Sequence, residues 1–179
     1  MNKHELRKKI LKTRKKNYFK ANLLNFSSIL KILKKEKFKG KIIGGYFPYN
    51  YEVDIINILR KFEQNNFIIS LPRIKKNFQM DFYQWSLKDP LKINNYGIPE
   101  PVSDKVLSPD MLLIPLVAFD ENLNRLGYGG GFYDRYISKI NKNKKIIKIG
   151  IAYSFQKVKK IPINKFDIKL NFIITEKSK

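Results

Sequence analysis

The strongest constraint on the fold is a buried-strand pattern that runs into a bare loop and then into a helical pattern. Residues 111–119, MLLIPLVAF, form an apolar run of strand length, which is typical of a strand covered on both faces. Residues 132–140, FYDRYISKI, place their apolar side chains on one side of a helix. The glycine-rich stretch NRLGYGGGFYDR links the two patterns. The order strand, glycine loop, helix predicts an α/β fold with the loop at a helix N-terminus.

The rest of the chain also alternates between helical and strand patterns. Helical spacing is present at residues 2–17, 20–36 and 51–63, and short apolar strand patterns occur at 41–48, 67–72, 146–153 and 171–175. Residues 78–85 alternate more weakly and indicate an antiparallel or edge strand, and residues 98–101, IPEP, are expected to be extended. We therefore predict a three-layer α/β/α fold around a central, mostly parallel sheet, with residues 1–179 as a single domain. The polar connection 76–97 is long enough to be a flap over a binding cleft.

The glycine loop has the composition of a phosphate site with a metal ligand. Gly127, Gly129, Gly130 and Gly131 lie between two arginines, and glycine lets another molecule approach the backbone. Unpaired amides at a helix N-terminus attract anions, and guanidinium groups suit phosphate oxygens. A carboxylate at position 134 would repel phosphates unless a cation lay between them, and Mg²⁺ binds through such a carboxylate plus phosphates. The alternative is a tight strand-to-helix turn, because glycine-rich loops are common there.

The basic charge has two explanations. The chain carries 37 Lys+Arg against 15 Asp+Glu, a net charge of +22, which is compatible with a nucleic-acid or other polyanion partner. Lysine, isoleucine and asparagine are nevertheless abundant throughout, as in KKEKFKGKIIGG, which points to a bias in composition. We expect no nucleic-acid partner, because the lysines are scattered over every predicted element.

Composition also excludes several classes of site. The absence of cysteine excludes disulfides and thiolate chemistry, and the single histidine, His4, cannot build a histidine-rich metal site. No apolar run approaches the roughly 20 residues of a membrane helix, and the N-terminus has no secretion signal. We expect a cytoplasmic protein, and a monomer.

The ordered motifs IPLVAFD, NRLGYGGGFYDRYI, GIAYSFQKV and FDIKLNFIITE resemble the 5-formyltetrahydrofolate cyclo-ligase family. The resemblance starts at KHELRKK, covers nearly the whole chain, and is most specific in RLGYGGGFYDR. It implies an enzyme that uses ATP and Mg²⁺ to close 5-formyltetrahydrofolate to 5,10-methenyltetrahydrofolate, with release of ADP and phosphate. In that reaction ATP phosphorylates the formyl oxygen, and N10 attacks the formyl carbon.

The resemblance also implies residue roles at the nucleotide end. Metal binding falls to Asp134 and Asp167, and Arg135 would neutralise charge on the transferred group. The ATP-binding residues it implies are Lys3, Arg7, Arg125, Leu126, Gly127, Tyr128, Gly129, Gly130, Gly131, Phe132 and Tyr133. The alternative for Arg135 is a salt bridge on the helix surface. Without the resemblance, Lys3 and Arg7 would form an ordinary solvated helix face, and Asp167 would be a loop or cap residue.

At the folate end, Glu52 is the expected catalytic and substrate-binding acid, which would accept a hydrogen bond from the pterin or from N10–H. Its alternative is an acidic residue in the first turn of a helix. Tyr133, Phe132 and Met80 are expected to bind the folate rings, and Tyr83 and Trp85 are further candidates for this apolar slot. Arg73, Lys75 and Lys76 are candidates to face the glutamyl tail.

Three positions depart from the family pattern. Leu116 and Leu123 stand where glycine is usual, and Phe166 stands where a histidine often precedes Asp167. An ATP-dependent enzyme that acts on another small substrate through the same loop is the remaining alternative function.

Overall fold

The computed structural model describes residues 1–18 and 24–178, which form one α/β unit. Its centre is a seven-stranded sheet in the order β11-β10-β7-β1-β2-β3-β6. β11 (Phe172–Ile174), β10 (Ile147–Ile151), β7 (Met111–Pro115), β1 (Ile42–Gly44) and β2 (Ile68–Ile74) pair in parallel. β3 (Met80–Gln84) runs antiparallel to β2, and β6 (Val106–Leu107) antiparallel to β3. The predicted mostly parallel sheet is confirmed, including the antiparallel strand at 78–85.

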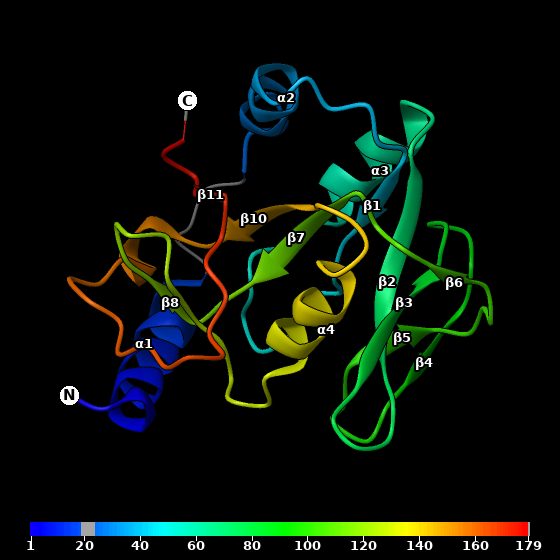
Figure 1. Ribbon diagram of the computed structural model, residues 1–179. Coiled ribbons are helices and arrows are strands. Elements are labelled where there is room, and N and C mark those ends of the chain that lie inside the picture. The colour runs from blue at the N-terminus through cyan, green and yellow to red at the C-terminus, as the bar shows by residue number, and fades with distance from the viewer. Residues whose placement is uncertain (19–23, 179) are drawn as a thin grey trace.

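Helices cover both faces of this sheet (Figure 1). α2 (Phe26–Lys35) and α3 (Ile56–Gln64) pack on one face, where Ile29, Leu59 and Phe62 are fully buried against the strands. α4 (Phe132–Ile140) packs on the other, where Tyr136 and Ile137 are buried beside Phe82 and Leu112. The predicted three-layer arrangement is therefore correct.

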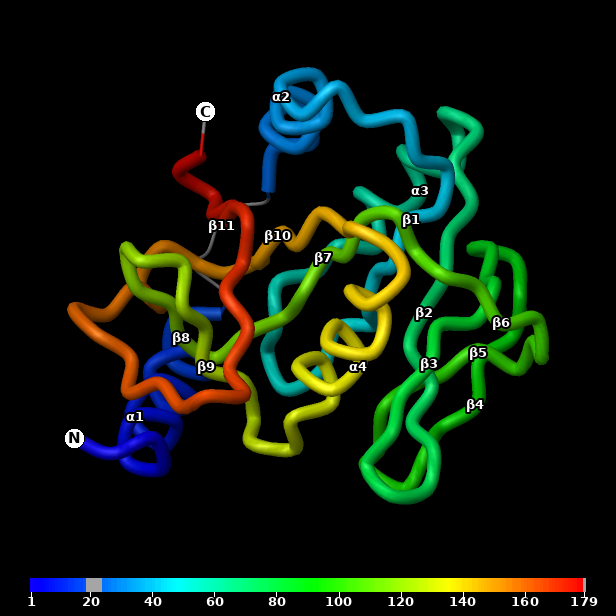
Figure 2. Tube along the Cα trace, in the orientation of Figure 1, coloured from blue at the N-terminus to red at the C-terminus, as the bar shows by residue number. Residues whose placement is uncertain are grey.

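α1 (Lys3–Asn17) lies at one end of the sheet, against a two-stranded hairpin of β8 (Ala118–Phe119) and β9 (Arg125–Leu126). Leu6 and Ile10 of α1 pack on Ala118 and Leu126, and Figure 2 shows these segments together. A capping box begins α1: the Asn2 side chain accepts from the Glu5 amide, and the Glu5 carboxylate accepts from the Asn2 amide. The N-terminal helix is thus built into the fold.

Several predicted boundaries were wrong. The apolar run 111–119 is two elements, because the chain leaves the sheet after Pro115 and enters β8; the glycine loop therefore follows β9. The strand predicted at 41–48 ends at Gly44, and the helix predicted at 51–63 begins only at Ile56. The helix predicted at 20–36 begins at Phe26; residues 20–23 of that prediction lie outside the described residues. Part of the predicted flap, 76–97, is strand β3, and only β4 (Leu91–Ile93), paired with β5 (Pro99–Pro101), forms a separate hairpin.

Gly44 tests the packing between β1 and the α4 face. A methyl group there would lie 2.5 Å from Leu112 Cδ2 and 2.9 Å from Phe82 Cε1. We expect Gly44→Ala to lower the free energy of unfolding by about 1–3 kcal/mol through overpacking, measured by urea denaturation. Gly127→Ala is the control, because an added Cβ there meets nothing within 4 Å. Equal stabilities for the two variants would contradict this packing.

Candidate active site

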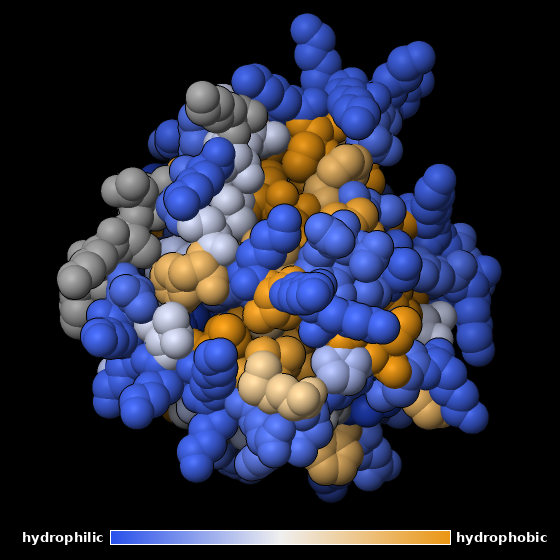
Figure 3. All heavy atoms as spheres, turned by 90° about the vertical axis from the view of Figure 1, so that its left-hand side faces the viewer, coloured by the Kyte–Doolittle hydropathy of each residue, from blue (hydrophilic) through white to orange (hydrophobic). Residues whose placement is uncertain are grey.

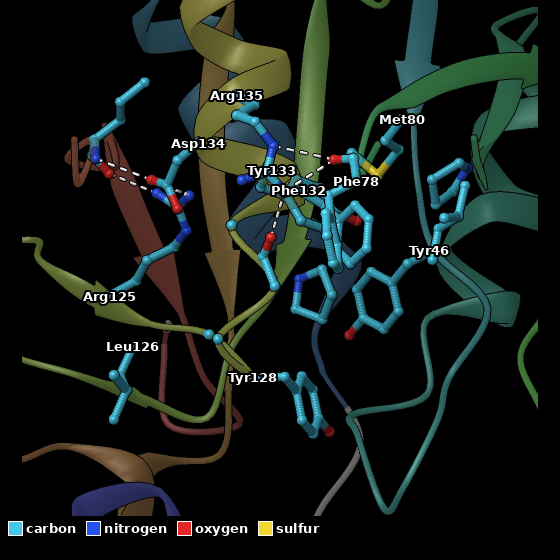
Figure 4. A pocket seen from close by; sticks show the side chains of 18 of the residues that line it. Tyr46, Phe78, Met80, Arg125, Leu126, Tyr128, Phe132, Tyr133, Asp134 and Arg135 are labelled. Carbon is cyan, nitrogen blue, oxygen red and sulfur yellow. Dashed lines mark hydrogen bonds and ion pairs between the residues drawn. The ribbon is translucent and has the colours of Figure 1, made fainter. Parts of the chain in front are cut away.

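A cavity of about 1170 Å³ opens beside the carboxyl ends of the central strands. This is the edge at which ligands of parallel α/β sheets bind. Its wall combines α1, the loops after β1 and β9, the start of α4, the β4–β5 hairpin and the loop before β11 (Figure 4). Every residue expected to bind ATP or metal lines it, together with four of the residues expected to contact folate: Lys3, Arg7, Glu52, Met80, Arg125, Leu126, Gly127, Tyr128, Gly129, Gly130, Gly131, Phe132, Tyr133, Asp134, Arg135 and Asp167.

The glycine loop presents a helix N-terminus to this cavity. Gly129 (φ 113°) and Gly131 (φ 65°) adopt conformations that favour glycine. Gly131 is the N-cap of α4, and no side chain caps the helix. The first amides of α4 are therefore available to an anion, and the helix dipole favours negative charge there.

Arg125 and Asp134 form an ion pair behind the loop. Arg125 Nη2 lies 2.7 Å from Asp134 Oδ1, and the arginine is 9% exposed. The same guanidinium donates to the Ile168 carbonyl, and the Ile168 amide donates to Asp134 Oδ1 at 3.0 Å. Arg125 thus ties β9, α4 and the loop before β11 together, in addition to its expected role near phosphate.

α1 approaches the same loop through two basic side chains. Lys3 Nζ lies 2.5 Å from Asp167 Oδ2, which also accepts from the Asn164 amide. Arg7 Nε donates to the Gly127 carbonyl at 2.8 Å, and its guanidinium lies over Gly129. Lys3 and Arg7 therefore face the cavity, and the solvated-face alternative does not hold.

The two carboxylates suit a magnesium ion bound together with phosphates. Both line the cavity, and each is about one quarter exposed. Asp134 Oδ2 and Asp167 Oδ1 accept no hydrogen bond from the described residues. No group of three or more His, Cys, Asp or Glu that could hold a metal occurs in the part of the chain that the structure describes. A cation here would need ligands from phosphate and water, the mode usual for Mg²⁺.

Arg135 bends across the rim. Its guanidinium donates to the carbonyls of Phe78, at 2.9 and 3.0 Å, and of Gly130. It forms no ion pair with a carboxylate of residues 1–18 or 24–178, so the surface salt bridge is not its role here. The side chain joins the glycine loop to the β2–β3 turn.

Glu52 is a buried acid in the cavity wall. It is 5% exposed and lies in a turn closed by the Tyr49 amide, which donates to Glu52 Oε2 at 3.0 Å. The alternative, an acidic residue in the first turn of a helix, was wrong, because α3 begins four residues later. Burial raises the pKa of Glu52 to about 7, against the lowering effects of the Tyr49 amide, Arg14 and Tyr128. A carboxyl with this pKa can take up or release a proton near neutral pH.

Aromatic side chains form another part of the cavity wall. Phe132, Tyr133 and Met80 contribute to it as expected, whereas Tyr83 and Trp85 do not line the cavity. The Tyr133 hydroxyl is buried without a partner among the described residues, and burial raises its pKa far above the usual value. Phe78 and Tyr96, which sequence reasoning missed, place their rings 6.2 and 6.3 Å from that of Phe132.

Two polar residues of the β4–β5 hairpin were also missed. Glu100 is 4% exposed and accepts from the Ile74 amide and the Asn94 side chain, both at 2.7 Å. Glu100 and Asn94 both line the cavity. The expected tail-binding residues do not: Arg73 pairs with Asp104 and Lys75 with Asp81, and Lys76 lies outside the wall.

The fold accommodates the three residues that depart from the family pattern. Leu123 has φ 63° in the β8–β9 turn, which explains why glycine suits that position. Leu116 is buried, with its side chain beside Gly150. Phe166 lines the cavity and is 71% exposed.

Fold and cavity together define an α/β enzyme whose cavity brings together a helix N-terminus without a side-chain cap, a buried acid and an aromatic wall. The model of the 5-formyltetrahydrofolate cyclo-ligase family matches residues 1–176, and the chain belongs to this family. It is accordingly an enzyme of folate one-carbon metabolism.

Individual relatives agree with this assignment. A 5-formyltetrahydrofolate cyclo-ligase of Haemophilus influenzae is 34% identical over 143 residues, 75% of each chain. A solved 5,10-methenyltetrahydrofolate synthetase of Aquifex aeolicus has a TM-score of 0.76 at 32% identity, over 99% of this chain and 91% of that one. That of Mycoplasma pneumoniae has a TM-score of 0.72 at 26% identity, over 99% and 100%.

The buried acid makes stability depend on pH. The folded-state pKa of Glu52 is about 7 against an ordinary value of 4.5, so its stabilising contribution is complete below pH 4.5 and is lost as the pH rises through 7. Glu52→Gln should remove this loss. Its free energy of unfolding relative to wild type should rise by up to about 3 kcal/mol between pH 4 and 8. A constant difference in urea denaturation at several pH values would refute the raised pKa.

Proposed function

We propose that the chain catalyses ATP- and Mg²⁺-dependent closure of 5-formyltetrahydrofolate to 5,10-methenyltetrahydrofolate, with ADP and phosphate as the other products. The observation that carries this proposal is the single cavity that joins the glycine loop to the buried Glu52. Such a cavity lets a nucleotide and a folate meet end to end.

The chemistry requires activation of an amide oxygen, which is a poor leaving group. Transfer of the γ-phosphoryl group of ATP to the formyl oxygen forms a new O–P bond and releases ADP. N10 then attacks the formyl carbon, the C–O bond breaks, and the former formyl oxygen leaves in phosphate. Closure also removes the proton of N10. Positioning and charge stabilisation are the enzyme's main contributions.

The nucleotide end is built from the glycine loop and α1. The amides at the start of α4 would bind phosphate oxygens, and Lys3 and Arg7, already at the loop, would neutralise their charge. Asp134 and Asp167 would hold Mg²⁺, which would offset the negative charge of the phosphates. Arg135 would need to leave the Phe78 carbonyl to reach the transferred group.

The folate end is built from the aromatic wall and Glu52. The rings of Phe132 and Tyr133, with Met80, offer an apolar surface to the pterin. Glu52, with a pKa of about 7, is suited to accept the N10 proton during closure. The unpartnered Tyr133 hydroxyl is a further donor beside it.

A nucleic-acid partner is not part of the proposal. Hydrophilic side chains cover much of the face in Figure 3, but apolar residues interrupt them. Two of the lysines that line the cavity pair with acids, Lys3 with Asp167 and Lys139 with Asp81. No helix in the described part of the chain is long and apolar enough to cross a membrane.

The proposal is tested first by the reaction itself. Purified protein with ATP, Mg²⁺ and 5-formyltetrahydrofolate should generate the absorbance of the methenyl product, and omission of ATP or Mg²⁺ should abolish it. Folded protein that forms no product under the complete conditions would reject the proposal.

Asp134→Asn tests the metal assignment. Asparagine keeps the size of the side chain and a partner for Arg125 but removes the negative charge, so we expect kcat to fall about 100-fold or more and the Mg²⁺ requirement to rise. Asp104→Asn is the matched control, because the Asp104 side chain is 92% exposed and outside the cavity. Wild-type kcat and an unchanged Mg²⁺ titration in Asp134→Asn would exclude Asp134 as a ligand.

A further inference from the structure

Arg14 is a buried cation behind the cavity that the reaction scheme leaves without a role. It lies in the last turn of the Lys-rich helix α1, yet it is only 1% exposed. Its neighbours Lys12 and Lys15 are exposed. Because removing a guanidinium from water is costly unless it is paired, its contacts require an explanation.

The guanidinium contacts three separate segments. Nη2 donates to the Asn50 carbonyl at 2.6 Å and to the Tyr128 hydroxyl, and Nη1 donates to the Leu116 carbonyl at 3.3 Å. Its Cζ also lies 5.4 Å from the centre of the Tyr128 ring. Nε has no hydrogen-bond partner among the described residues. Arg14 therefore joins the strand end after β7, the turn before Glu52, and the glycine loop.

Tyr128 contacts Arg14 and also interacts with Glu52. Its hydroxyl accepts from Arg14, and the Tyr128 side chain interacts with the Glu52 carboxyl and lowers its pKa. The Tyr128 ring also lies 6.4 Å from that of Tyr49, whose amide closes the Glu52 turn. Asn50 and Tyr51 both have positive φ, 47° and 62°. This uncommon turn conformation is one that neighbouring contacts must hold in place.

We propose that Arg14 is a positioning residue for ring closure: it holds Tyr128 of the glycine loop and the turn that carries Glu52 in one arrangement, so that the two ends of the cavity form together. This inference rests on the proposed function of the same cavity. Arg14 does not line the cavity. It acts through Tyr128 and the Asn50 carbonyl.

The ionisable groups around Glu52 give this role a measurable signature. Tyr46, Tyr128 and Tyr133 interact with it electrostatically, and Arg14 is the cation that lowers its pKa. Removal of the Arg14 charge should therefore raise the pKa of Glu52. A residue that only fills space would leave this titration unmoved.

The test is a titration of the Glu52 carboxyl carbon by NMR in ¹³C-glutamate-labelled full-length protein, with the signal assigned by Glu52→Gln. Arg14→Met keeps the buried stem and removes the charge, and it should shift the Glu52 titration to higher pH by about one unit. Tyr128→Phe, which removes only a hydroxyl, should shift it in the same direction. Lys12→Met, an exposed change of equal charge on the same helix, should leave it in place.

Kinetic measurements distinguish the effect of the Arg14 charge from its role in positioning. We expect kcat to fall about 100-fold in Arg14→Met, since small displacements of reacting groups are costly. Arg14→Lys should return the Glu52 titration toward wild type without restoring kcat, because an ammonium group cannot reproduce the fork of donors.

The outcomes are distinct. If Arg14→Met does not fold, Tyr128→Phe carries the test alone. An unmoved Glu52 signal in Tyr128→Phe and in folded Arg14→Met, or an equal shift in Lys12→Met, would overturn the inference while wild-type activity stood. Absence of methenyl product with wild-type protein would instead reject the proposed function, and the carboxyl titration would still report on Arg14.

Discussion

The site depends on the central strand β7 having no free edge. β7 is hydrogen-bonded to β1 on one side and β10 on the other, and Met111–Ile114 are fully buried. The chain must therefore leave the sheet at its carboxyl end, after Pro115. There it forms the β8–β9 hairpin, which α1 covers, and returns through the glycine loop to α4. The cavity is the space that this excursion leaves above the strand ends.

Ion pairs then stabilise the segment between β7 and α4. Asp134 and Asp167 each meet a cation from a different segment, Arg125 from β9 and Lys3 from α1. Both acids and both bases line the same cavity, so the pairs are partly shielded from water. Binding of Mg²⁺ and phosphates would place a cation near the acids and anions near the bases, and so preserve the charge balance of the site.

The sequence predicted those parts of the molecule whose patterns are local and strong. The buried run at 111–115 is continuously apolar and the helix at 132–140 has clear periodicity, and the bare glycines between them mark the loop that borders the cavity. Glu52 was correctly expected in the cavity, but it was predicted in a helix and lies in a turn. The apolar spacing from Val53 onward suggests a helix, whereas the chain first makes a turn with positive φ at Asn50 and Tyr51.

Other features depend on contacts that no single sequence displays. Val117–Phe119 read as a continuation of β7, because nothing local marks the exit after Pro115. Glu100 and Tyr96 reach the cavity only through the β4–β5 hairpin. Arg14 reads as one more basic residue on a basic helix, and only tertiary structure shows that it is buried.

The reaction proposed for this cavity transfers the γ-phosphoryl group of ATP to the formyl oxygen of the folate. It is tested with 5-formyltetrahydrofolate that carries ¹⁸O in the formyl group, by mass analysis of the released phosphate. We expect one ¹⁸O atom in each phosphate formed with the methenyl product. Unlabelled phosphate, with the ¹⁸O recovered in water, would show that the formyl oxygen is never phosphorylated and would rule out this transfer.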